Sequence, residues 1–277
     1  MNNSARWLLL VVIAAAVMIY LYLSQTSDVL TPDAARLPVP EAQTEPASEP
    51  QISYPIVTEQ EQFETPVARD PLPLLADSDA AMTVMLIGLV GDAAFEQLFR
   101  SENIVQRIVT TVDNLDRKKL APKILPLQSA GGEFMVSRET GNLSIAEENH
   151  QRYAAYVILT EAIDTNNLVA AYSRYYPLFQ EAYTGLGYPA AYFNDRLVAV
   201  IDHLLATPDV QPPFELVKPE AFYLYADPDL ESLSAGQKNL LRLGPEHGAR
   251  IRSKLQEIRL ALSQPSATPE DAGSGSE

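Results

Sequence analysis

Cysteine is absent from this 277-residue chain. Without a thiol, the protein cannot use a cysteine nucleophile, bind a metal through thiolates or form a disulfide. A lipoprotein anchor is excluded as well, because that anchor is made by acylating a cysteine. Histidine is scarce: His150, His203 and His247 lie far apart in the sequence and show none of the spacings of a histidine metal site. We therefore expect no metal and no cofactor.

Sequence motifs of common enzyme classes are missing too. The chain has no GxSxG or SxxK motif and no GxxxxGK[ST] loop, so nothing indicates a nucleophilic serine or a bound nucleotide. Residues 233–237, LSAGQ, are similar to the signature loop of ATP-binding-cassette ATPases. Without a phosphate-binding loop, we expect Ser234 instead to cap a helix that starts at Ala235. The catalytic residues are unknown, and the sequence favours a protein that is not an enzyme.

Basic residues are few, 20 against 36 acids, and the formal net charge is −16. Most of this excess lies in the flanks: residues 24–76 carry nine acids and two arginines, whereas residues 77–263 carry 24 acids and 17 bases. A protein that binds nucleic acid needs clustered bases to neutralise phosphates. We therefore expect no nucleic-acid partner, and the acidic flanks favour solubility.

A long apolar run near the N-terminus begins at Trp7 and ends at Leu23. Its 17 residues would span roughly 26 Å as a helix, close to the thickness of the hydrocarbon core of a bilayer. The alanines lie in the middle of the run, so it lacks the small-residue end of a cleaved signal peptide and indicates an uncleaved anchor. Arg6 precedes the run and Asp28 is the first charge after it, which predicts a cytoplasmic N-terminus.

Composition divides the rest of the chain into three parts. Residues 24–70 are rich in proline and acids, and residues 263–277 are small and polar. Neither part can bury enough apolar surface to offset its ordering entropy, so we expect a disordered tether and a disordered tail. Residues 71–262 have the periodic apolar pattern of one folded domain.

Helical spacing dominates that domain. It predicts helices over residues 78–90, 93–99, 102–112, 146–163, 165–186, 192–205, 235–243 and 245–262. Ser78, Ser101 and either Asp164 or Thr165 are the expected caps, and Pro177 should kink its helix. Residues 133–145 read as a pair of short strands, and residues 214–218 and 222–225 read as a second pair of strands or as extended segments. The predicted fold is mainly α, a compact multi-helix domain with one or two small β-hairpins.

Three long blocks of the domain resemble a known family. They are RIVTTVDNL (107–115), YYPLFQEAYTGLGYPAAYFNDRLVAVIDHLLATP (175–208) and YADPDLESLSAGQKNLLRLGPEHGARIRSKLQEIR (225–259). Together they resemble the bacterial "domain of unknown function 3014" family over about residues 71–262. The resemblance implies the limits of the domain and a bacterial envelope setting. It carries no activity, cofactor or catalytic residue with it.

One local pattern suits ligand recognition by its mixture of chemical groups. The candidate ligand-binding residues are Tyr192, Asn194, Asp195 and Arg196, which follow a glycine-rich turn at a helix start. An aromatic ring, an amide, a carboxylate and a guanidinium together suit sugar or peptide recognition. The favoured interpretation is structural: Asn194 or Asp195 would assist the helix N-terminus, and Arg196 would pair with an acid such as Glu181.

Two other charged features have a functional and a structural interpretation. Asp195 and Asp202 stand on one helix face roughly 10 Å apart, near the upper limit for the paired carboxylates of a glycosidase. The last two helices carry the bases Lys238, Arg242, Arg250, Arg252, Lys254 and Arg259, which suit anionic lipid or glycan. In both cases the favoured interpretation is a solvated helix face, and the bases would also complement the helix dipole.

Taken together, these features predict a non-enzymatic interaction or scaffold protein of the bacterial inner membrane. Residues 7–23 would cross the membrane once, with the N-terminus in the cytoplasm and the domain in the periplasm. The expected partners are the membrane and an envelope protein, with no nucleic acid and no nucleotide. The alternative is an envelope protein that binds or hydrolyses the glycan of the cell wall, peptidoglycan.

Overall fold

The computed structural model describes residues 52–56, 71–128, 133–138, 141–220 and 222–263. The predicted membrane run, the tail after residue 263 and most of the predicted tether lie outside these residues. The helices are α3 (Asp79–Val90), α4 (Asp92–Leu98), α5 (Ile104–Asn114), α6 (Glu148–Gln151), α7 (Ala154–Ala162), α8 (Thr165–Gly185), α9 (Phe193–Leu205), α10 (Pro228–Ser232), α11 (Ala235–Arg242) and α12 (Pro245–Ser263). The short 3-10 turns are η2 (Leu75–Asp77) and η3 (Pro122–Ile124), and the strands are β1 (Val136–Ser137), β2 (Leu143–Ile145), β3 (Glu215–Val217) and β4 (Leu224–Tyr225). The prediction of a mainly α fold is confirmed.

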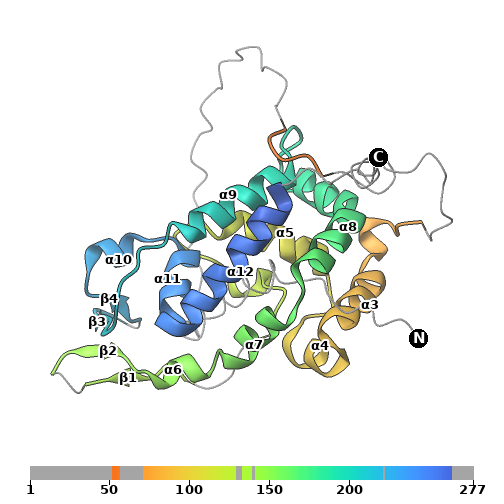
Figure 1. Ribbon diagram of the computed structural model, residues 1–277. Helices are drawn as coiled ribbons and strands as arrows, with labels where there is room; N and C mark the ends of the chain where they lie inside the picture. Colours follow the sequence, from red (N-terminus) through yellow and green to blue (C-terminus); the bar gives the residue numbers. More distant parts are fainter. Residues whose placement is uncertain (1–51, 57–70, 129–132, 139–140, 221, 264–277) are drawn as a thin grey trace, which may run out of the picture.

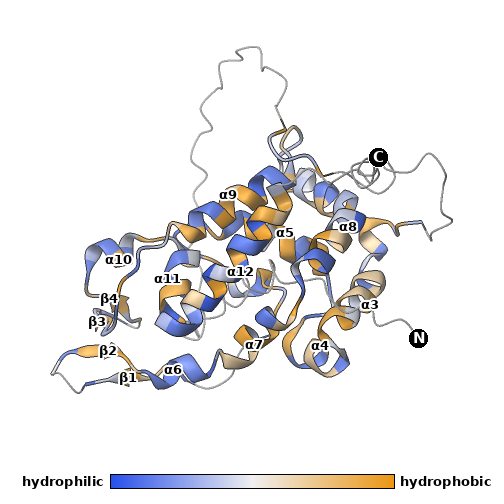
Figure 2. Cartoon of the chain, in the orientation of Figure 1, coloured by the Kyte–Doolittle hydropathy of each residue, from blue (hydrophilic) through white to orange (hydrophobic). Residues whose placement is uncertain are grey.

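The main core lies between the long helices. α12 packs against α7, α8 and α9, and α5 packs against α8 and α9 (Figure 1). The helical spacing read from the sequence matches the buried faces, because the buried residues of α9 include Leu197, Val200, Ile201 and Leu204, and those of α12 include Ile251, Leu255, Ile258 and Leu262. Hydrophobic residues alternate with hydrophilic ones along these helices, whereas α10 is coloured mainly hydrophilic (Figure 2). This core fixes the position of α9, which carries the candidate residues.

The two predicted hairpins join in one small antiparallel sheet. Its strand order is β1-β2-β3-β4, and the second hairpin pairs with the first through Leu143 and Leu216. The sheet lies at the end of the domain away from α3 and α4 (Figure 1). It has an apolar cluster of its own, made by Phe214, Leu216, Tyr225, Leu230 and Leu241. Residues 228–232, where the apolar spacing predicts no helix, form α10 beside β4.

The single helix expected over residues 146–163 is wrong, since the chain turns between α6 and α7. Asn149 explains the break because its side chain bonds the backbone N–H and C=O of Met135, at 3.0 and 2.6 Å, beside the sheet. α7 packs instead against α12. The two short helices therefore contact different parts of the domain.

Helix caps came partly from distant residues. Ser101 does not cap α5; Asp79 of α3 does, because its carboxylate accepts from the amides of Asn103 and Ile104 at 2.7 and 2.8 Å. Ser78 holds the expected position before α3, but its hydroxyl donates to a backbone carbonyl instead of capping. Asp164 caps α8 as predicted.

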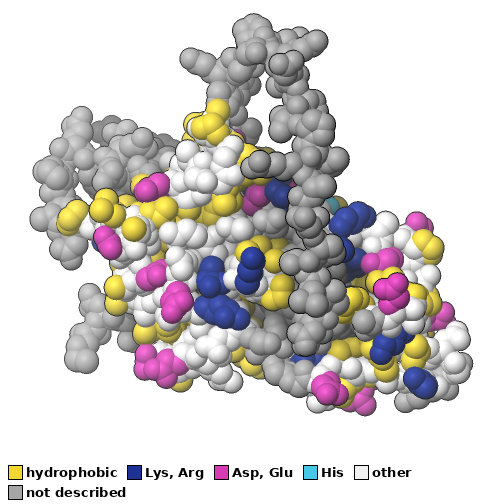
Figure 3. All heavy atoms as spheres, turned by 180° about the vertical axis from the view of Figure 1, so that it is seen from behind, with side chains coloured by type: hydrophobic (Ala, Val, Ile, Leu, Met, Phe, Trp, Pro, Cys, Tyr) yellow, Lys and Arg dark blue, Asp and Glu magenta, His cyan; other side chains and the backbone are white. Residues whose placement is uncertain are grey.

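The described surface mixes apolar and charged side chains. Seen from behind, Lys and Arg side chains gather near the middle of the face with Asp and Glu side chains beside them (Figure 3). Over the described ranges, no individual helix has the length and apolar composition that a membrane span requires. α3 and α4 satisfy those requirements only as a pair, and they are bent by 116° relative to each other.

Candidate functional site

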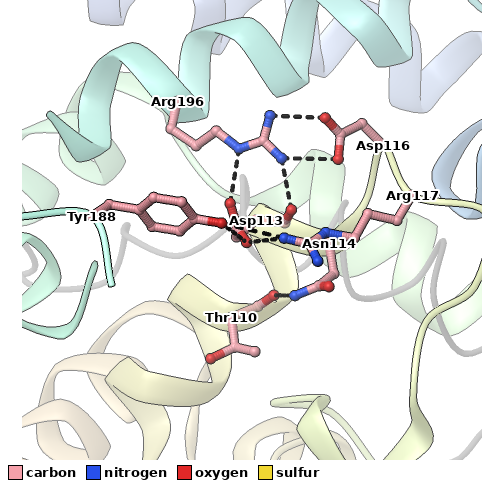
Figure 4. Close-up of polar contacts among 7 residues, drawn as sticks. All are labelled: Thr110, Asp113, Asn114, Asp116, Arg117, Tyr188 and Arg196. Atoms are coloured by element: carbon pink, nitrogen blue, oxygen red, sulfur yellow. Dashed lines mark hydrogen bonds and ion pairs between the residues drawn. The ribbon is translucent and has the colours of Figure 1, made fainter. Parts of the chain in front are cut away.

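Arg196 joins α9 to the C-terminal end of α5 (Figure 4). Its guanidinium makes a two-pronged contact with the carboxylate of Asp116, with both N–O distances 2.8 Å. Nε donates to the carboxylate of Asp113 at 3.1 Å, and Nη2 donates to the backbone carbonyl of the same residue at 2.6 Å. The Asp113 carboxylate also accepts from Arg117 at 2.9 Å and from the Tyr188 hydroxyl at 3.3 Å. One buried carboxylate thereby links the end of α5, the turn after it and the loop before α9.

Burial and ion pairing shift the pKa values of Asp116 and Arg196 in opposite directions. Partial burial alone would raise the pKa of Asp116, but the hydrogen bonds and the positive charge of Arg196 outweigh it, and the pKa is lowered. Burial alone would lower the pKa of Arg196, but its two acidic partners, Asp116 and Asp113, outweigh this effect and the pKa is raised. Asp116 and Arg196 therefore form an ionised pair at neutral pH.

Arg196 pairs with acids as expected, but these acids are Asp113 and Asp116 and not Glu181. Glu181 is exposed on α8, while the actual partners lie 83 and 80 residues away in sequence. In the sequence, Asp113 merely follows the helix predicted over residues 102–112. No local spacing connects it to α9, so only the packing of α5 against α9 could show the pair.

Asp195 and its neighbours contact a different part of the chain. The two carboxylate oxygens of Asp195 accept from the backbone amides of Ser53 and Tyr54, at 3.0 and 2.8 Å. The Tyr192 hydroxyl accepts from the amide of Ile56 at 2.8 Å. These donors belong to residues 52–56, inside the part of the chain that composition assigned to a disordered tether. The signal in the sequence was the alternation of large apolar residues within ISYPI.

Asn194 also contacts residues 52–56. Its side-chain amide donates to the carbonyl of Tyr54 at 2.9 Å, and the residue is fully buried. Asp195 lies in the first turn of α9, where a negative charge favours the helix N-terminus as expected, but neither Asn194 nor Asp195 caps the helix with its side chain. Gln180 of α8 does so, because its Oε1 accepts from the amide of Phe193 at 2.8 Å.

Aromatic rings surround the start of α9, as its sequence indicated. The rings of Tyr176 and Tyr192 lie 5.1 Å apart, and those of Phe179 and Phe193 stack at 6.0 Å. The Tyr172 ring lies 6.4 Å from that of Phe193, and its burial raises the pKa of its hydroxyl well above the ordinary value. Burial also raises the pKa of the Tyr176 hydroxyl, so both of these hydroxyls stay protonated.

The two acids considered as a glycosidase pair are separately engaged. Asp195 holds the backbone of residues 53 and 54, while Asp202 accepts from Nε and Nη2 of Arg259 at 2.9 and 3.2 Å. The Arg259 guanidinium lies 5.9 Å from the centre of the Tyr54 ring. This arrangement suits an aromatic residue bound beside α12 more than a water held between two carboxylates.

The bases of the last two helices do not form the solvated face that we expected. Lys238 and Arg242 are 4% exposed and Lys254 is 8% exposed. Lys238 pairs with Glu231 at 2.7 Å and Lys254 with Glu257 at 2.8 Å. Arg250 pairs with Glu161 and Arg259 with Asp202. The periodic pattern identified the apolar stripe correctly, but it could not show that acids of α7, α9 and α10 would pair with Arg250, Arg259 and Lys238.

The histidines show no arrangement for a metal. His203 lies 2.9 Å from the Ser234 hydroxyl, which caps α11 in the capping box that the sequence predicted in part. Burial, and then the charge of His247, lower the pKa of His150. Among the residues that the structure describes, no group of three His, Asp or Glu side chains is placed to hold a metal ion.

The fold and contacts define a helical domain with a small sheet that holds a short segment of its own chain against α9. The model of the family described as protein of unknown function (DUF3014) matches residues 104–259. The chain belongs to this family. The matched range includes α5, α9 and the Arg196 cluster, and residues 52–56 lie before it. No curated protein and no solved structure matches the chain.

Proposed function

We propose that this chain is a single-pass, membrane-anchored protein of the bacterial cell envelope whose periplasmic domain is a non-enzymatic interaction module. The apolar run over residues 7–23, with Arg6 before it and Asp28 after it, supports the anchor and its orientation. The domain follows a proline-rich and acidic stretch, which gives it reach from the membrane surface.

One observation carries the interaction role. The edge of α9 holds a polypeptide through its backbone: the Asp195 carboxylate accepts two amides, the Tyr192 hydroxyl accepts a third and the Asn194 amide donates to a carbonyl. Groups that satisfy backbone donors and acceptors are what a peptide ligand needs. Nothing comparable supports the alternative of glycan cleavage, because Asp195 and Asp202 each have another partner.

Photo-crosslinking in cells tests this proposal. A photoreactive residue would replace Ala199, an exposed position one turn along α9 from Asp195, in the full membrane-bound chain. The matched control places it at Val84 of α3, which is 73% exposed. We expect adducts with an envelope protein from position 199 that position 84 does not give. Binding to purified cell wall together with no protein adduct at either position would contradict the proposal and favour the glycan alternative.

A further inference from the structure

Residues 52–56 contact α9 in the manner of a bound peptide. Each hydrogen bond between the segment and the candidate residues uses a backbone group of the segment. The amides that α9 accepts belong to residues 53, 54 and 56, and the residue passed over is Pro55, which has no N–H to donate. The site therefore tolerates a proline at this one position and requires free amides on both sides of it.

The side chains of the segment divide into two sets. Tyr54 and Ile56 are half-buried against the main core, while Ser53 and Pro55 are exposed. The Tyr54 ring lies beneath the guanidinium of Arg259, which Asp202 holds in place. Backbone contacts give affinity and the alternate inward side chains give selectivity, as in other sites for extended peptides.

The segment leaves part of the site unsatisfied. Asn194 is fully buried, yet its Oδ1 atom has no hydrogen-bond partner among the described residues, and the same is true of the Tyr172 hydroxyl. A buried polar atom without a partner weakens the state that contains it. These unmet groups lower the affinity of the site for residues 52–56, so a partner segment can compete with them for the site.

We propose that residues 52–56 are a built-in ligand that closes a peptide-binding site on α9, and that a partner segment with tyrosine, proline and an aliphatic residue in succession displaces it. This inference rests on the proposed function and names the chemistry of the partner. The built-in ligand is joined to the domain through residues 57–70, so its effective concentration at the site is on the order of millimolar. A partner must overcome this occupancy, which keeps the site closed until such a segment is abundant or near.

Fluorescence anisotropy on the full chain in lipid nanodiscs tests the inference. The probe is a labelled peptide of residues 48–60, SEPQISYPIVTEQ. A double variant, Tyr54→Ala with Ile56→Ala, removes the inward side chains of the segment, and we call it the released chain. We expect the released chain to bind the probe about tenfold or more tightly than the wild type does, because cis competition is lost. Adding Asp195→Asn should remove that gain, whereas adding Glu181→Gln, at an exposed acid of α8, should leave it unchanged.

A second released chain, the variant Ser53→Pro, controls for the possibility that the double alanine substitution disturbs folding of the domain. Ser53→Pro removes one amide bound by Asp195 and alters an exposed residue without touching the core. It should raise probe affinity in the same direction with an unchanged circular dichroism spectrum. Equal affinities in the wild-type and both released chains would overturn the inference. So would a wild-type dimer that dissociates in the released chains, because the segments would then be exchanged between copies.

The two proposals fail separately. If release leaves probe affinity unchanged while position 199 still captures a protein, the built-in ligand is wrong and the interaction role survives. If the probe binds the released chain while neither chain captures a protein in cells, the proposed function is wrong and the peptide site remains.

Discussion

Arg196 forms an ion pair with the buried carboxylate of Asp113. The Asp113 side chain is 6% exposed, and the guanidinium contacts both its carboxylate and its backbone carbonyl. Removing the cation leaves this acid with Arg117, whose side chain is 53% exposed, and with the Tyr188 hydroxyl. The role of Arg196 therefore differs from that of its neighbour Asp195, although the two are adjacent in the sequence.

We expect Arg196→Ala to lower the free energy of unfolding by about 1–3 kcal/mol, the range for a buried polar group that loses its partner. The measurement is urea unfolding of the full chain followed by circular dichroism. Arg138→Ala, at an exposed position after β1, is the control and should change stability by less than about 0.5 kcal/mol. An Arg196→Ala chain as stable as the control would show that the cluster contributes nothing to folding.

The same cluster gives a pH dependence. The pKa of Asp116 is lowered from its ordinary value of 3.8, because Arg196 outweighs the opposing effect of burial. Its contribution to stability is complete above the ordinary value and is lost as the pH falls through the lower, folded-state value. From about pH 5 to about pH 3, the wild type should lose more stability than Arg196→Ala does, in which the partner is gone. Parallel stability curves for the two chains over that range would count against the pairing.

At the scale of elements, α11 begins where α5 has ended. The amides of Ala235 and Gly236 donate to the carbonyls of Arg117 and Leu115, at 2.7 and 2.9 Å. A Cβ on Gly236 would lie 2.6 Å from the Leu204 side chain and 2.9 Å from the Leu115 carbonyl. This close approach explains a glycine inside the LSAGQ sequence by packing, without any nucleotide.

Gly236→Ala should destabilise the domain by about 1–3 kcal/mol, the usual cost of overpacking. Gly185→Ala is a matched control, because a Cβ at the end of α8 meets nothing within 4 Å. Thermal unfolding of the two chains tests the difference. If both variants melted with the wild type, the approach of α11 to α5 would be looser than described.

Local signals predicted most elements, and long-range contacts account for what was missed. The spacing of apolar residues gave α9 and α12, and Pro245 after Gly244 marked the start of α12 as expected. The cap of α5 came from Asp79 of α3, and the joining of the two hairpins depended on pairing between Leu143 and Leu216. Neither contact has a signature within one short window of sequence.

The candidate site was likewise predicted from local signals, while its long-range contacts were not. The sequence selected Tyr192, Asn194, Asp195 and Arg196 from their side-chain chemistry alone. It could not separate Arg196, which contacts α5, from the other three, which contact residues 52–56. The segment itself was hidden because proline and acids dominate its surroundings, and average composition outweighed two inward-facing apolar residues.

At the scale of the whole molecule, the segment lies between the proposed anchor and the domain. Releasing it would add residues 52–70 to the chain that separates the two, about 60 Å of fully extended backbone. The domain would then reach farther from the membrane when residues 52–56 leave the α9 site than when they occupy it.

Orientation in the membrane is testable on the full chain. A reporter enzyme that works only outside the cytoplasm, fused after Glu277, should be active, because Arg6 favours the cytoplasmic side. A reporter that works only in the cytoplasm should be inactive at the same position. The reverse pattern would place the domain in the cytoplasm and remove the proposed envelope setting.

The central claim is that α9 holds residues 52–56 through their backbone, and amide hydrogen exchange measures this directly. In the full wild-type chain, the amides of Ser53, Tyr54 and Ile56 should exchange more slowly than those of an unstructured peptide. Asp195→Ala should speed exchange at Ser53 and Tyr54, and Tyr192→Phe should speed it at Ile56, since each removes the acceptor of those amides. Exchange at unprotected rates at all three positions in the wild type would contradict the account.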